Sequence, residues 1–225
     1  MIAQKGIELH MEYSARIRMG LLSLVAGSVL GIVGLVLRGP VPLPNVDVDT
    51  WAQAVTGNKY FQAQILTIFA YVLPYFGFWA IYAYLVKAAK VERSAFWGFM
   101  CSIVGTSLAL PTLGIFSFVS PHLAQRYLQG ENQLPEIITQ VATGQPAVIN
   151  LLGGTIYLIG TGLLGVAIWR SGLLPKWAGL LIALHGLLLV VGFALFPLLV
   201  LSWVFLFCAG LWMFLIIKDE RPIGR

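Results

Sequence analysis

The chain has 225 residues, of which 59% are hydrophobic and 10% are charged, and its formal net charge is +5. Soluble domains carry about 25% charged residues, so this composition excludes a water-soluble fold and indicates an integral membrane protein whose first partner is the lipid bilayer. The positive charge does not indicate a nucleic-acid partner, because the lysines and arginines form no basic run and lie near the ends of apolar stretches.

Six apolar stretches follow one another along the chain, and each is about as long as a helix that crosses the hydrocarbon core. They are residues 19–37, 62–86, 95–117, 148–169, 177–195 and 198–217, and none of them contains Asp or Glu. The sequence therefore predicts an all-α transmembrane bundle of six spans that forms one domain over residues 1–225. The alternative for the last two stretches is a re-entrant pair, because only Phe196 and Pro197 separate them.

The basic residues orient this bundle. If six spans alternate in direction, eleven of the fourteen lysines and arginines fall on one face. These eleven are Lys5, Arg16, Arg18, Lys87, Lys90, Arg93, Arg170, Lys176, Lys218, Arg221 and Arg225. Because cytoplasmic loops are enriched in basic residues, both termini are predicted to be cytoplasmic. The chain has no Asn-x-Ser/Thr sequon, and together these features favour the inner membrane of a bacterium.

The two outer loops, 38–61 and 118–147, are longer than the inner ones and contain short helical patterns. In the first loop Asp49 is a candidate N-cap for a short helix that includes Trp51. In the second, four apolar residues recur at helical spacing, which predicts an amphipathic helix lying on the outer interface. They are Leu134, Ile137, Ile138 and Val141.

Glycines line one face of the first span, at Gly20, Gly27, Gly31 and Gly34. Gly27 and Gly31 form a small-xxx-small pair, which lets a second helix backbone approach closely. The fourth span is also rich in glycine, with Gly153, Gly154, Gly160, Gly162 and Gly165. Two partners for these faces stay open: other helices of the same chain, or another subunit in a homo-oligomer or a larger membrane complex.

An aromatic stripe lies on one face of the second span, formed by Tyr71, Tyr75, Phe78 and Tyr82, with Pro74 predicted to kink the helix. Tyrosine hydroxyls in hydrocarbon need hydrogen-bond partners, so the stripe is expected to face protein, water or a ligand rather than lipid tails. The alternatives are core packing and a pocket for an apolar ring or chain.

Polar residues near the middle of the spans form a second set of ligand-pocket candidates. Besides Tyr75 they include Thr106, Ser107, Tyr157 and His185. His185 is a functional candidate because polar groups at this depth are costly to bury. Three alternatives apply to it: a hydrogen-bonded structural histidine, a pocket residue, or an axial ligand of a haem or chlorophyll-type group. No cofactor and no metal site are predicted, since no second histidine lies in a span.

Missing motifs narrow the function further. Cation-coupled transport generally requires a carboxylate within a span, and no span contains one. No His-Glu-x-x-His or Ser-His-Asp arrangement is present either. No catalytic residue is therefore predicted. The leading hypothesis is a non-enzymatic accessory or scaffold subunit, or a bundle that binds a lipid-like ligand. The alternatives are a facilitator for a neutral or apolar solute, and a membrane enzyme or haem- or pigment-binding protein centred on His185.

Two stretches carry a resemblance to a known group of proteins. They are Ser14-Ala15-Arg16-Ile17 before the first span, and the run from Ala167 to Gly179 with its Trp169-Arg170-Ser171-Gly172 turn and Pro175-Lys176-Trp177. With these motifs the chain resembles a broad group of bacterial multi-pass membrane proteins that share a domain of unknown function. The resemblance implies a helical membrane bundle and supplies no catalytic or binding residues.

Overall fold

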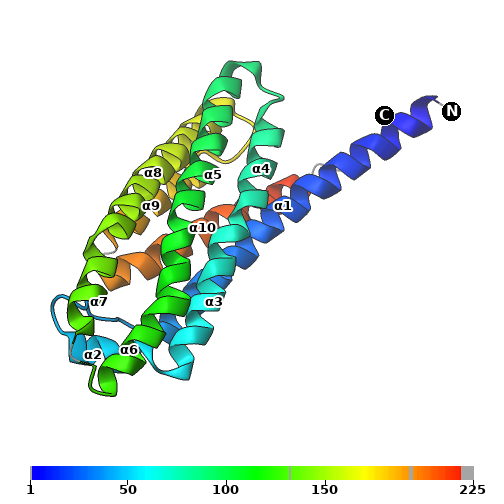
Figure 1. Ribbon diagram of the computed structural model, residues 1–225. Helices are drawn as coiled ribbons and strands as arrows, with labels where there is room; N and C mark the ends of the chain where they lie inside the picture. The colour runs from blue at the N-terminus through cyan, green and yellow to red at the C-terminus, as the bar shows by residue number, and fades with distance from the viewer. Residues whose placement is uncertain (1, 132, 193–194, 219–225) are drawn as a thin grey trace.

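The computed structural model describes residues 2–131, 133–192 and 195–218, and every regular element in these ranges is helical. The prediction of an all-α bundle with apolar, membrane-spanning helices is confirmed. The bundle in Figure 1 consists of α1 (Ile2–Arg38), α3 (Asn58–Val72), α4 (Pro74–Leu85), α5 (Glu92–Gly114), α8 (Gln145–Ser171), α9 (Lys176–Val191) and α10 (Phe196–Lys218).

The helices of the bundle run in two main directions (Figure 1). α3, α4, α5, α8 and α9 run side by side, whereas α1 and α10 pack against each other and cross them obliquely. α1 begins and α10 ends at the same end of the bundle, where the turns before α5 and before α9 also lie. The basic residues of those turns are therefore gathered at one end, here called the inner end. Arg221 and Arg225 lie outside the described residues.

Among the described residues, five helical stretches are long and apolar enough to cross a membrane. α9 is the exception, because it has 16 residues and ends at Val191, whereas the predicted span continued to residue 195. At 1.5 Å per residue α9 is about 24 Å long, shorter than the hydrocarbon core of about 30 Å. Residues 193–194 of the predicted span lie outside the described residues. The count of six complete spans therefore stays a prediction.

Two of the long stretches change helix geometry along their length. The second breaks at Leu73 into α3 and α4, as expected from Pro74, which cannot donate the backbone hydrogen bond that a continuous helix needs. The third does not end at residue 117. α5 continues through a π-helical turn, η2 (Ile115–Val119), into α6 (Ser120–Leu128), so the segment predicted as the second outer loop begins inside a helix.

The two outer segments fold together into a cap at the end opposite the inner end (Figure 1). α2 (Val48–Val55), α6 and α7 (Leu134–Thr143) meet around an apolar cluster of their own. Trp51 and Ile138 are buried in it, whereas Ile137 is exposed. The predicted amphipathic α7 is thus present, and part of its apolar face packs on protein instead of the bilayer interface. The cap gives the outer end a defined shape.

The N-cap of α2 is Asp47 and not Asp49, which corrects the sequence-based assignment. The Asp47 carboxylate accepts hydrogen bonds from the backbone N–H of Thr50 at 3.0 Å and from its hydroxyl at 2.6 Å. An N-cap side chain bonds to the N–H group two or three residues inside the helix, and Asp47 has this spacing. Asp49 lies in the first turn and accepts a hydrogen bond from the Tyr127 hydroxyl at 2.7 Å, which ties α2 to α6.

We expect Asp47→Ala to speed hydrogen exchange in the first turn of α2 at neutral pH. Hydrogen bonds from the Thr50 side chain, and then from its backbone, hold the pKa of Asp47 below its ordinary value. The folded-state pKa is therefore lower than the unfolded-state pKa. The stabilisation is present above the unfolded-state value of about 3.9 and is lost as the pH falls through the folded-state pKa.

Hydrogen-exchange mass spectrometry checks this prediction. Gln53→Ala, an exposed change in the same helix, is the control. Wild type and Asp47→Ala should converge as the pH falls below the folded-state pKa, after correction for intrinsic exchange. Equal exchange in the two proteins at neutral pH would contradict the capping role.

The glycine face of α1 packs against helices of the same chain. A Cβ added at Gly20 would lie 2.5 Å from the Cβ of Ala80, and one at Gly27 would lie 2.8 Å from the ring of Pro74. Gly31 lies against the indole of Trp203, and Gly34 is close to Thr67. Of the two partners that the sequence left open, internal packing therefore accounts for all four glycines.

Candidate functional site

His185 lies in the centre of the bundle with its side chain fully buried. α8 and α10 provide its two hydrogen-bond partners. The hydroxyl of Tyr157 is 2.9 Å from Nε2, and the backbone carbonyl of Ser202 is 2.9 Å from Nδ1. The rings of Tyr157 and Trp203 pack against the imidazole, with centroid distances of 5.8 and 5.3 Å. His185 thus joins three helices through both ring nitrogens.

The partners of His185 define its tautomer. A carbonyl oxygen only accepts, so Nδ1 carries a proton and donates to Ser202, and in the neutral ring Nε2 then accepts from the Tyr157 hydroxyl. This is a neutral imidazole with no lone pair left over. Axial ligation of a haem or chlorophyll-type group would first have to break the bond to Tyr157. The arrangement is the one expected for a hydrogen-bonded structural histidine.

A small cavity lies beside this cluster, between α3, α5, α8 and α9. Its lining includes Tyr71, Thr106, Asn150 and Tyr157, and its volume is about 20 Å³. A cavity needs about 10–15 Å³ to hold a single water molecule, so this space suits about one water and not an apolar ring or chain. Its surface is almost entirely apolar, so it offers few hydrogen-bond partners even to a water.

The aromatic stripe divides between two environments. Phe78 is fully buried and packs against Tyr157, and Tyr71 packs edge-on against Trp203 at 5.5 Å. Tyr75 and Tyr82 instead face α5 and do not reach the His185 cluster. The eight pocket candidates are therefore two groups: Tyr71, Phe78, Thr106, Tyr157 and His185 in the core, and Tyr75, Tyr82 and Ser107 between α4 and α5.

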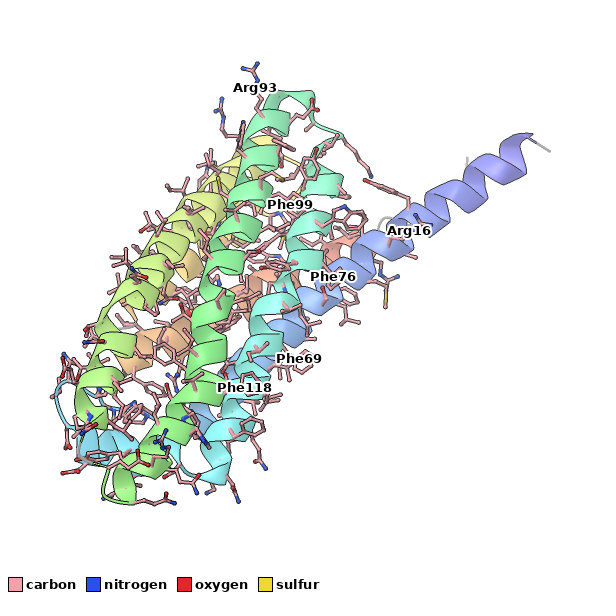
Figure 2. The ribbon with its side chains drawn as sticks, viewed as in Figure 1. Arg16, Phe69, Phe76, Arg93, Phe99 and Phe118 are labelled. Carbon is pink, nitrogen blue, oxygen red and sulfur yellow. The ribbon has the colours of Figure 1, made fainter. Side chains whose placement is uncertain are left out.

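The contact between the α3–α4 pair and α5, here called the seam, is made largely by aromatic side chains. Tyr82 stacks on Phe99 with a centroid distance of 5.4 Å, and the Tyr75 hydroxyl hydrogen-bonds with that of Ser107 at 3.1 Å. Near the outer end Phe61 meets Phe118 edge-on at 6.0 Å. Figure 2 shows Phe118 and Phe99 on one side of the seam and Phe69 and Phe76 on the other.

The seam widens at its outer end into a groove of about 600 Å³. Phe61, Phe118, Pro121 and Leu128 form its apolar lining, and Thr56, Asn58, Ser117, His122 and Gln125 form its polar lining. Small-molecule sites typically have volumes of about 300–1,000 Å³ and combine apolar walls with a few polar groups. The groove falls within this range of volume and has a mixed lining, but it is open on its outer side, whereas the central cavity is too small.

Sequence reasoning missed the groove and two core residues. Ser202 and Trp203 complete the His185 cluster, but nothing in the sequence distinguished them from other residues of an apolar span. The groove combines residues from both outer segments, so no single stretch could reveal it. The sequence shows only that Phe61 and Phe118 lie at the ends of two spans, which is typical of the aromatic residues at a membrane interface and does not predict a groove.

Within the part of the chain that the structure describes, no three His, Cys, Asp or Glu side chains gather as a metal site would require. No curated protein and no solved structure matches the chain significantly. The family model of DUF4386, a domain of unknown function, matches residues 19–218, which cover the cap and all of the helical bundle except the first half of α1. The chain therefore belongs to the DUF4386 family, which agrees with its resemblance to bacterial membrane proteins that share a domain of unknown function.

Proposed function

We propose that the protein is a non-enzymatic bundle of a bacterial inner membrane that binds a lipid-like amphiphile in the outer groove. The observation that carries this proposal is the groove itself, which combines a volume of about 600 Å³ with both apolar and polar residues in its lining. Both termini are cytoplasmic in this proposal, because the basic turns and the start of α1 share the inner end. The groove then opens on the outer face.

The position of the groove supports an amphiphile over a fully polar ligand. Its aromatic wall continues along the seam into Phe69 and Phe76, which are exposed side chains of α3 and α4 (Figure 2). Two of its polar residues, His122 and Gln125, belong to α6 of the cap. An amphiphile could leave its tail along the seam and place its polar end near His122 and Gln125.

Native mass spectrometry of protein extracted in mild detergent from its own host tests this proposal. We expect a discrete added mass in the wild type and its loss in Phe118→Ala, because that change removes one apolar wall of the groove. Leu151→Ala is the control, since Leu151 is a 64% exposed apolar residue of α8 and belongs neither to the groove nor to the seam. A wild-type mass equal to the bare chain, or equal loss in both variants, would refute the groove as a binding site.

A further inference from the structure

Two buried polar atoms without partners lie at the outer ends of α1 and α3. One is Nε of Arg38, the last residue of α1, and the other is Oε1 of Gln64, whose side chain is 1% exposed. Nε is a donor and Oε1 is an acceptor. A buried polar atom that lacks a hydrogen bond costs free energy, so a ligand that accepts from Arg38 and donates to Gln64 would be favourable in this region.

The packing of α1 on α3 brings these groups together. Gly34 lies against Ala63 and Thr67, and Arg38 follows one helical turn later towards the outer end. Tyr60 and Gln64 occupy the adjoining turn of α3, where Nε2 of Gln64 donates to the Tyr60 hydroxyl at 2.7 Å. That hydroxyl donates in turn to the Phe116 carbonyl at 3.2 Å. Arg38 also lies near the phenol groups of Tyr60 and Tyr71.

No carboxylate among the described residues neutralises Arg38. The acids of the outer cap all have other partners. Asp47 caps α2, Asp49 accepts from Tyr127, Glu131 pairs with Arg126, and Glu136 lies within reach of Gln140. A partly buried guanidinium without a counter-charge is costly, and Arg38 lies on the face that has few other cations.

Arg38 lies at the outer end of the first apolar span, because the stretch Tyr13–Arg38 that is apolar enough to cross a membrane ends at this residue. Nε of Arg18, near the opposite end of α1, is also buried without a hydrogen-bond partner, but that guanidinium stacks over the ring of Phe214. At a span end Arg38 is close to lipid headgroups, and its planar fork of N–H donors suits phosphate oxygens.

We propose that Arg38, Tyr60 and Gln64 form a binding site for a phosphate group, delivered by an outer-leaflet phospholipid whose headgroup also carries a hydroxyl. The guanidinium of Arg38 donates to the phosphate, and the headgroup hydroxyl donates to Oε1 of Gln64. The site is separate from the groove, because Tyr60 is buried inside the cap whereas its neighbour Phe61 lines the groove. The proposal does not depend on the amphiphile that the groove binds.

Lipid titration of the delipidated full-length protein, followed by native mass spectrometry, tests the site. The probes are phosphatidylglycerol, phosphatidylcholine, diacylglycerol and inorganic phosphate. We expect one phosphatidylglycerol to bind, phosphatidylcholine to bind more weakly because it lacks a donor for Gln64, and diacylglycerol not to bind. Arg38→Gln should weaken phosphatidylglycerol binding at least tenfold. Lys59→Gln removes the same charge from an exposed outer position and should leave the affinity unchanged, as should Phe118→Ala.

Gln64→Glu keeps the proposal testable if Arg38→Gln does not fold. The new carboxylate would provide Arg38 with a counter-charge inside the protein, so we expect a higher Tm without lipid and loss of phosphatidylglycerol binding. Unchanged lipid binding in both variants would overturn the proposal. Stabilisation of the wild type by inorganic phosphate, without binding of any phospholipid, would overturn the lipid as the source of the phosphate.

Discussion

Replacing Gly160 by alanine is expected to destabilise the bundle severely, whereas the same replacement at Gly162 should be tolerated. Gly160 lies where α8 and α5 touch along their backbones. A Cβ at this position would overlap the backbone nitrogen of Ser102 and lie 2.6 Å from its Oγ. Around Gly162, two residues further along the same helix, the space within 4 Å of an added Cβ is open.

The cost at Gly160 is high because backbone cannot move aside as a flexible side chain can. Gly105 and Gly153 make a second backbone contact between α5 and α8, where a Cβ at Gly153 would lie 2.7 Å from the Gly105 carbonyl oxygen. Separating the helices to fit one methyl group would therefore loosen the whole interface. Overpacking typically costs about 1–3 kcal/mol, and we expect Gly160→Ala to reach or exceed the upper end of that range.

Thermal unfolding in detergent, followed by tryptophan fluorescence, measures the difference between the two variants. Gly162→Ala keeps the Tm of the wild type within error, and Gly160→Ala lowers it sharply or prevents purification as a monodisperse protein. Similar Tm values for both variants would show that α5 and α8 are not in backbone contact at Ser102.

His185→Ala is the second change with a large expected effect. It removes a fully buried ring and leaves the Tyr157 hydroxyl and the Ser202 carbonyl without their side-chain partner. Cutting a large buried side chain to alanine typically costs about 2–5 kcal/mol. Tyr157→Phe, which removes only the hydrogen bond, should cost less, because such bonds between membrane helices contribute about 0.6 kcal/mol and at most about 1.7.

The same unfolding assay tests this ranking, and His122→Ala is the control because His122 is exposed on α6. The expected order of destabilisation is His185→Ala, then Tyr157→Phe, then His122→Ala with no change. An absorption spectrum of the purified protein adds an independent test. A visible band in the wild type that disappears in His185→Ala would contradict the structural role and favour the haem or pigment alternative.

The sequence alone determined the class of the molecule. Apolar runs without carboxylates require that every backbone polar group is satisfied within its own helix, so an all-α bundle follows from local composition. Pro74 likewise predicted the break at Leu73, because the loss of one N–H donor acts within a single helix. The glycine face of α1 could also be predicted, because the periodicity of 3.6 residues within a single helix places Gly27 and Gly31 on one side.

Tertiary structure decided what each face meets. Periodicity predicts that Tyr71 and Tyr75 project from one stretch of helix, but not that one packs on Trp203 and the other on Ser107. His185 was a candidate for a ligand site until α10 supplied the carbonyl of Ser202. The groove combines residues that lie more than fifty positions apart, such as Phe61 and Phe118. Such contacts depend on how helices pack against one another, and in a uniformly apolar sequence that information is not encoded in any local pattern.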